Sequence, residues 1–273
     1  MVKLSFTTLG CPGWSLEKIA EVGKSLGYDG VELRTHPDGN HLSPEASAKE
    51  AREVAALFRD HALPIASVMG YTTFAHTERK DIEDNQRHMR QLIGLAAEMH
   101  APFIRTFAGR IPQGLERSRA VDIVVNAILP LAVEAAGAGT KIGLETHDDW
   151  CSGALLKQVC EGVNSPGFGV VYDAFNAFVA GIEPWQHTYE CIQPHLAYCQ
   201  LKDGYRDLEG KLHYVYLGAG ELPTADILSR LKQDHFSGYL SFEWEKKWHA
   251  ELAEPEQAFP HFPFKVRQLW GTA

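Results

Sequence analysis

Short apolar runs alternate with longer segments of helical periodicity along the whole chain. The apolar runs predict strands over 3–9, 30–33, 64–69, 102–107, 141–145, 167–173, 196–203 and 238–245. A helical segment follows each run; in 78–99, for example, apolar residues recur three or four positions apart and predict one buried face. Eight strand–helix repeats indicate a parallel sheet covered by helices. Their number favours an α/β fold of the closed (β/α)8 type, a TIM barrel, over a doubly wound open sheet.

Turn and capping signals refine this organisation. No Pro-, Gly- or Ser-rich linker divides the chain, so we expect a single domain over residues 1–273. The longest irregular stretch, 204–223, predicts a hairpin insertion that could overhang a site. Ser15 is expected to cap one helix and Ser43-Pro44 to open another, because proline is tolerated at the first helical position. The sequence GAGELP, 218–223, lacks the GxxxxGK[ST] pattern of a phosphate loop and is typical of a turn.

Charge and cysteine usage narrow the classes of partner. The 273 residues include 26 Lys and Arg against 35 Asp and Glu, a net charge of −9, which disfavours nucleic acid as a partner. The first residues show no signal-peptide pattern, and we find no run of about 18 apolar residues that would span a membrane. The five cysteines are odd in number and form no CxxC pair, so we expect reduced thiols in a cytoplasmic protein.

Polar residues stand at the carboxyl ends of the predicted strands, where a barrel of this type carries its active site. Side chains alternate along a strand with a period of two. Glu145 and His147 therefore share one face, as do Gln200 and Lys202, and we expect them to converge on one end of the barrel. The complete set comprises Glu32, Arg34, Arg105, Glu145, His147, Asp173, Gln200, Lys202, Glu243 and Glu245.

Carboxylates crowded at one end of a barrel would repel each other unless a cation lay among them. Carboxylate and carboxamide oxygens are hard ligands that suit Mn²⁺ or Mg²⁺. Glu145 and Glu243 come from strands that are not neighbours, so they could serve as base and acid on two sides of a substrate.

Structural interpretations of the same residues stay open. Asp173 is also placed to cap the following helix. Glu32 and Arg34 are equally consistent with a mutual ion pair, and Asp148 and Glu245 with solvated loop charges. Aromatic residues near the strand ends are expected either to form an apolar wall over a sugar ring or to fill the core: Trp14, Phe74, Phe107, Trp150, Tyr205 and Trp244.

Six motifs in order resemble the sugar phosphate isomerase/epimerase family, the xylose isomerase-like TIM barrels. They are LGCPGWSLEKIAEVGKSLGYDGVELR, IRTFAG, GLETHDD, VVYDAFN, CQLKDG and LSFEWE. The resemblance implies one divalent metal ion, most often Mn²⁺, held by Glu145, Asp173, Gln200 and Glu243. It also implies that Glu145 and Glu243 are the acid/base pair and that Arg206 binds substrate.

Two residues depart from the pattern of the ketose 3-epimerases, so the identity of the substrate stays open. Ketose 3-epimerases of the family usually have histidine where this chain has Asn176 and Gln200, and hydroxypyruvate isomerases have Gln at the second position. A second branch, the 3-dehydroshikimate dehydratases, is similar in IRTFAG, in LETH and in the lysine that follows the third ligand. That similarity implies substrate contacts from Arg105, His147 and Lys202.

The leading hypothesis is a metal-dependent isomerase or epimerase that acts on a small keto-sugar or polyol derivative through an enediolate. The alternative is a lyase of the 3-dehydroshikimate dehydratase type, in which the same enolate expels a leaving group. An endonuclease-IV-like DNA repair enzyme is disfavoured by the net charge and by histidines outside the expected strand ends. A non-catalytic sugar-binding subunit is disfavoured by the complete acid/base and ligand set. A homo-oligomer is compatible with the family.

Overall fold

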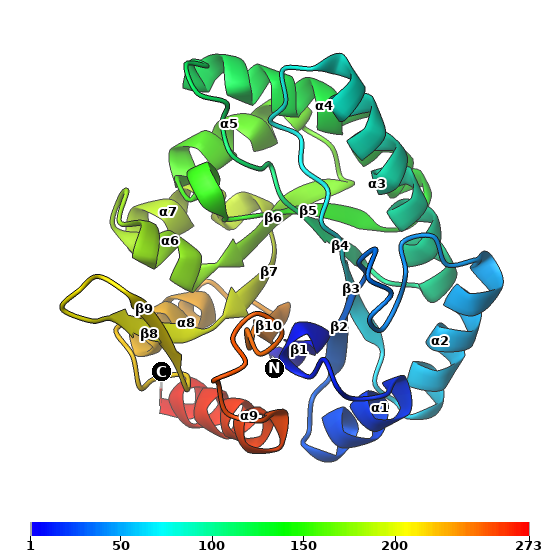
Figure 1. Cartoon of the computed structure of the whole chain (residues 1–273). Coiled ribbons are helices and arrows are strands. Elements are labelled where there is room, and N and C mark those ends of the chain that lie inside the picture. Colours follow the sequence, from blue (N-terminus) through cyan, green and yellow to red (C-terminus); the bar gives the residue numbers. More distant parts are fainter. Residues whose placement is uncertain (1, 273) are drawn as a thin grey trace.

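The computed structural model describes residues 2–272, which form a ring of parallel strands surrounded by helices (Figure 1). The strand order is β1-β10-β7-β6-β5-β4-β3-β2, and the ring is closed. The prediction of a (β/α)8 barrel is therefore confirmed, and the open sheet is excluded. The barrel strands are β1 (Lys3–Thr7), β2 (Gly30–Arg34), β3 (Ile65–Met69), β4 (Phe103–Thr106), β5 (Lys141–Glu145), β6 (Phe168–Asp173), β7 (Leu196–Leu201) and β10 (Tyr239–Phe242).

The helices follow the strands in alternation and cover the outside of the ring. They are α1 (Leu16–Ser25), α2 (Ala48–Asp60), α3 (Arg79–Met99), α4 (Arg117–Gly137), α5 (Gly153–Val163), α6 (Ala174–Ala180), α7 (Trp185–Ile192), α8 (Thr224–Gln233) and α9 (Pro255–Thr272). Short 3₁₀ helices are η1 (Thr8–Gly10), η2 (Asp148–Trp150) and η3 (Gln193–His195). The main hydrophobic core includes outward-facing strand residues such as Leu144 and Leu201 together with buried residues of these helices.

The capping signals had different outcomes. Ser15 caps α1, and its Oγ accepts a hydrogen bond from the Lys18 N–H, as expected. The predicted start at Ser43-Pro44 is wrong, because α2 begins at Ala48. Ser47 and Glu50 form a reciprocal capping box there, which satisfies two free N–H groups and fixes the helix start later in the chain.

Helix α4 is long and apolar enough, by length and composition alone, to cross a membrane. In the structure it is one of the barrel helices: Val124, Ile128 and Leu131 are fully buried, and it packs against α3, α5 and β5. The apolar residues of α4 thus belong to the hydrophobic core of the barrel.

A small antiparallel sheet interrupts the alternation after β7. Strands β8 (Asp203–Arg206) and β9 (Leu212–Val215) pair as a hairpin that begins one residue before the predicted stretch 204–223. The glycine-rich turn that follows wraps around the buried Asp203 carboxylate. That carboxylate accepts hydrogen bonds from the backbone N–H groups of Gly204, Gly218, Gly220 and Leu222, at 2.8–3.1 Å. GAGELP is therefore a turn in which the N–H groups of Gly218, Gly220 and Leu222 are occupied by the chain's own carboxylate.

Candidate active site

Three buried carboxylates meet where the strands end, at the end of the barrel that we call the mouth. Glu145 is the last residue of β5, Asp173 is the last residue of β6, and Glu243 directly follows β10. One oxygen of each lies within 4.8 Å of an oxygen of the others. We call these three residues the acidic triad. Asp173 also caps α6, because its Oδ1 accepts a hydrogen bond of 2.8 Å from the Asn176 N–H.

The Lys202 ammonium group, which follows β7, lies among these carboxylates. Its Nζ is 2.9 Å from Asp173 Oδ2, 2.5 Å from Glu243 Oε2 and 2.8 Å from Glu245 Oε1. The interpretation of Glu245 as a solvated loop charge is therefore wrong, since its side chain is only 13% exposed. Period-two alternation already placed Glu245 on the same face as Glu243, and that signal could have identified it.

Arg105 from β4 neutralises the third carboxylate. Its Nε lies 3.0 Å from Glu145 Oε2, and its Nη1 donates to the Gly70 carbonyl oxygen at 2.8 Å. The guanidinium carbon is also 4.9 Å and 4.2 Å from the ring centroids of Tyr71 and Phe107. Both ring faces therefore lie within the range of a cation–π interaction with this buried cation.

The pKa values of Glu145 and Glu243, the two glutamates of the triad, are shifted in opposite directions. Burial raises the pKa of Glu145 to about 8, although the Arg105 cation favours ionisation. Burial also opposes ionisation of Glu243, but Lys202, a hydrogen bond with Asp173 and Arg105 together lower its pKa to about 2. Burial raises the pKa of Asp173 against the attraction of Lys202. Such divergence between neighbouring carboxyl groups is typical of acid/base sites.

The donor set fits a hard divalent cation. Gln200 Nε2 donates to Glu32, whereas the buried Gln200 Oε1 has no hydrogen-bond partner among residues 2–272. The carboxamide oxygen of Gln200 and the three carboxylates of the triad are oxygen ligands of the type that Mn²⁺ and Mg²⁺ prefer. Two cations, Arg105 and Lys202, contact the carboxyl groups of Glu145, Asp173, Glu243 and Glu245.

A cavity of about 210 Å³ opens above the triad. Its size suits a small molecule, and both aromatic and charged side chains line it. It is lined by Leu9, Tyr71, Arg105, Phe107, Glu145, His147, Lys202, Glu243, Glu245 and Trp248.

Of the six aromatic residues proposed from the sequence for an apolar wall, Phe107 alone lines this cavity. Trp14, Phe74, Trp150 and Trp244 are buried in the core, and Tyr205 is 41% exposed. Tyr71 and Trp248 were missed, because they lie in loops beyond the strand ends, where no periodic pattern marks them.

His147 separates the triad cavity from a second cavity of about 190 Å³. Asn176 and Arg206 line the second cavity, so the structure does not bring Arg206 to the acidic triad. Arg206 Nη1 instead donates to the Gly210 carbonyl oxygen within the hairpin, at 2.9 Å. Asn176 Nδ2 donates to Glu145 Oε1 at 3.2 Å and thereby fixes that carboxylate from the β6–α6 side.

Glu32 and Arg34 do not pair with each other. Arg34 donates to both oxygens of Asp38, at 2.7 and 3.0 Å, and its Nε donates to Tyr71 Oη at 3.1 Å. Glu32 contacts Tyr198 and Gln200 across the barrel interior. The two side chains thus belong to different layers of the barrel.

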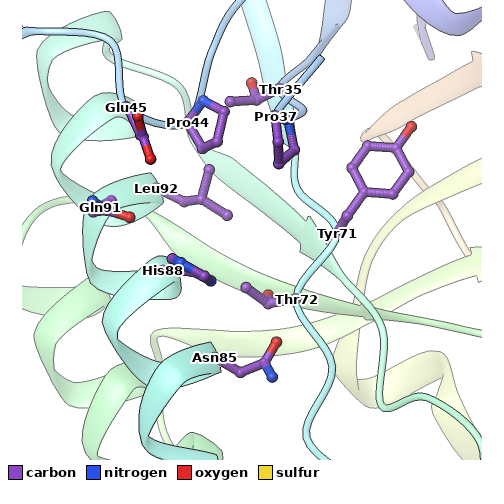
Figure 2. Close-up of a pocket in the computed structure, with 10 residues that line it drawn as sticks. All are labelled: Thr35, Pro37, Pro44, Glu45, Tyr71, Thr72, Asn85, His88, Gln91 and Leu92. Carbon is purple, nitrogen blue, oxygen red and sulfur yellow. The ribbon is translucent and has the colours of Figure 1, made fainter. Parts of the chain in front are cut away.

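A third cavity of about 120 Å³ lies between the loop after β2 and helix α3 (Figure 2). Its residues include Pro37, Pro44, Asn85 and His88, together with Tyr71, which also lines the triad cavity. Figure 2 shows Tyr71 at the side nearest the barrel, apart from the α3 residues. No member of the acidic triad lines it.

The chain belongs to the xylose isomerase-like TIM barrel family, whose model matches residues 20–261. No curated protein matches the sequence. Among solved structures, the chain is similar to the probable 3-DHS dehydratase AsbF from Bacillus anthracis (18% identity, 98% and 99% of the two chains covered, TM-score 0.76). It is also similar to 3-keto-D-glucoside 4-epimerase YcjR from E. coli (15%, 98% and 100%, TM-score 0.78). A third similar structure is the IOLI protein with a bound zinc atom (18%, 99% and 99%, TM-score 0.82).

Proposed function

We propose that the protein is a divalent-metal-dependent isomerase or epimerase of a small keto-sugar or polyol derivative. The observation that carries this proposal is the acidic triad at a cavity of about 210 Å³. Two glutamates of the triad, Glu145 and Glu243, line this cavity, and their pKa values are shifted in opposite directions. Family membership and the fold shared with a sugar epimerase support it.

Glu145, Asp173, Gln200 and Glu243 would hold one cation, for which we propose Mn²⁺. The cation would supply a Lewis acid that polarises a substrate carbonyl and stabilises an enediolate. Glu145 and Glu243 approach the cavity from β5 and from the end of β10. One of them can therefore take a proton from a substrate carbon while the other returns one to the same or the neighbouring carbon.

Cationic and aromatic side chains would orient the substrate. Arg105, His147 and Lys202 line the triad cavity and can donate hydrogen bonds to hydroxyl, carbonyl or carboxylate oxygens. Arg206 would contact a substrate only where it extends past His147 into the second cavity. Tyr71, Phe107 and Trp248 would cover the apolar face of the substrate.

A lyase reaction of the 3-dehydroshikimate dehydratase type is the second candidate. The position of Lys202 favours it, because its ammonium group lies 2.5 Å from Glu243 and could protonate a departing hydroxyl group. The AsbF structure shares the fold.

The domain organisation, the partner and the cellular location of the protein are inferred from other features of the chain. We propose that residues 1–273 form one domain, that the partner is a small sugar-like molecule rather than nucleic acid or membrane, and that the protein is cytoplasmic. The free cysteines and the acidic net charge support these proposals.

Turnover in D₂O with Mn²⁺ distinguishes the two reactions, with ketoses, hydroxypyruvate and 3-dehydroshikimate as substrates. An isomerase or epimerase introduces deuterium at carbon with no other change in mass, whereas a lyase releases water. Glu243→Gln should lower kcat by about 10²–10⁴-fold because the acid/base group is lost. Glu251→Gln, which changes an exposed glutamate of the following loop, is the matched control.

An unchanged kcat in Glu243→Gln would assign the proton transfer to another residue. Full activity of protein treated with EDTA would remove the metal from the mechanism.

A further inference from the structure

A buried polar layer lies one level deeper in the barrel than the acidic triad. Tyr198 precedes Gln200 on β7 by two residues, so both side chains face the interior, with Tyr198 further from the mouth. Tyr198 Oη donates to Glu32 Oε2 at 2.5 Å and lies 3.1 Å from Ser67 Oγ. Glu32, Ser67 and Gln200 are all fully buried.

The hydrogen bonds of Glu32 orient the Gln200 carboxamide. Gln200 Nε2 lies 3.3 Å from each of the two Glu32 oxygens. A carboxylate only accepts hydrogen bonds, so it attracts the NH₂ end of the amide and disfavours the flipped arrangement. The amide oxygen must then point away from Glu32.

Gln200 Oε1 lacks the hydrogen-bond partner that Gln200 Nε2 has in Glu32. It is buried, and none of residues 2–272 donates a hydrogen bond to it. Gln200 is in register with Asp173 on β6 and with Ser241 on β10, two residues before Glu243. A buried carbonyl oxygen without a partner is costly, so a ligand at this position would stabilise it.

We propose that Glu32 is a positioning residue: it holds Gln200 Nε2 so that Gln200 Oε1 is presented as the fourth oxygen ligand beside the triad. This inference rests on the metal site of the proposed function and adds the residue that orients one ligand. Glu32 itself touches neither the cation nor the substrate. Groups that orient a ligand in this way commonly change metal affinity 10–100-fold when they are lost.

The test measures Mn²⁺ binding without substrate, by titration calorimetry and by the EPR signal of free Mn²⁺. In Glu32→Gln the introduced amide can donate a hydrogen bond to Gln200 Oε1. The proposed ligand oxygen is then either occupied by this hydrogen bond or rotated away from the triad. We expect the Kd for Mn²⁺ to rise by about 10–100-fold. Tyr198→Phe is the matched control, since it removes a hydroxyl that donates to Glu32 but leaves the contact with Gln200 intact, and its Kd should stay close to that of the wild type.

The double variant Glu32→Gln/Gln200→Glu distinguishes loss of the orientation of the Gln200 carboxamide from a general disruption of the buried polar layer. The introduced amide at position 32 now faces an introduced carboxylate at position 200, which presents oxygen whichever way it turns. Equal Mn²⁺ affinity in the double variant and in Gln200→Glu alone would support the orienting role, because both carry the same added carboxylate ligand. If Glu32→Gln does not fold, Glu32→Asp keeps the charge but shortens the reach, and it should also weaken binding.

Two results would overturn the inference in distinguishable ways. A wild-type Kd in Glu32→Gln would show that Glu32 does not orient the ligand, while the proposed function would stand. A wild-type protein that binds no Mn²⁺, Mg²⁺ or Zn²⁺ would remove the metal site itself, and both proposals would fail together.

Discussion

At the scale of single residues, the site depends on side chains that carry two tasks at once. Asp173 caps α6 with one carboxylate oxygen and contacts Lys202 with the other. The sequence left capping and metal binding as alternatives for this residue, but two oxygens on one carboxylate make both compatible. Lys202 likewise serves as the internal counter-ion of the triad and as a lining residue of the cavity.

Lys202→Met should destabilise the metal-free protein, because Asp173 and Glu243 would stay buried without their cation. Breaking a buried ion pair from one side costs about 3–5 kcal/mol. Urea unfolding in EDTA measures the loss, and Lys80→Met, which breaks an exposed pair with Asp84, should change the stability little. Equal effects of the two substitutions would show that Lys202 contributes no more than a surface charge.

At the scale of elements, strands were easier to predict than helix starts. The apolar runs coincide with the barrel strands to within a few residues, because the strand side chains that face the helices are buried in the hydrophobic core. The start of α2 was misplaced because two capping signals lie close together in the chain, Ser43-Pro44 and Ser47 with Glu50. Only the second allows a reciprocal hydrogen-bond pair.

The β8–β9 hairpin depends on Asp203, whose carboxylate ties the start of β8 to the turn that follows β9. Asp203→Asn offers only one acceptor oxygen, so at least two of the four N–H groups should lose their partner, at about 1.5–3 kcal/mol for each charge-assisted hydrogen bond. Hydrogen exchange should show loss of protection over residues 204–222. Glu209→Gln at the exposed hairpin tip is the control, and equal loss in both variants would contradict the anchoring role.

At the scale of the whole molecule, closure of the barrel gathers the site. β5, β6 and β7 are neighbours in the ring, and β10 closes it between β7 and β1. Glu145, Asp173, Lys202 and Glu243 therefore come together although almost 100 residues separate the first from the last. The mutual repulsion of the three carboxylates is a cost to the folded state that cations offset.

Binding of a divalent cation should therefore stabilise the whole barrel. With Mn²⁺ at 100 times its Kd, the free energy of unfolding should rise by about 2.7 kcal/mol, and EDTA should reverse the change. Thermal unfolding with and without Mn²⁺ measures this, and Glu145→Ala should show no rise. A Tm that does not respond to Mn²⁺ in the wild type would contradict cation binding at the triad.

The sequence by itself determined the (β/α)8 class and the set of polar residues at the strand ends. Both follow from local periodicity, since a period of two assigns faces on a strand and a period near 3.6 assigns them on a helix. Only the tertiary structure decided which residues pair. Glu32 contacts Tyr198 and Gln200, 166 and 168 positions away, and Tyr71 and Trp248 enter the cavity from loops. These contacts depend on closure, on strand register and on loop paths, which no local pattern encodes.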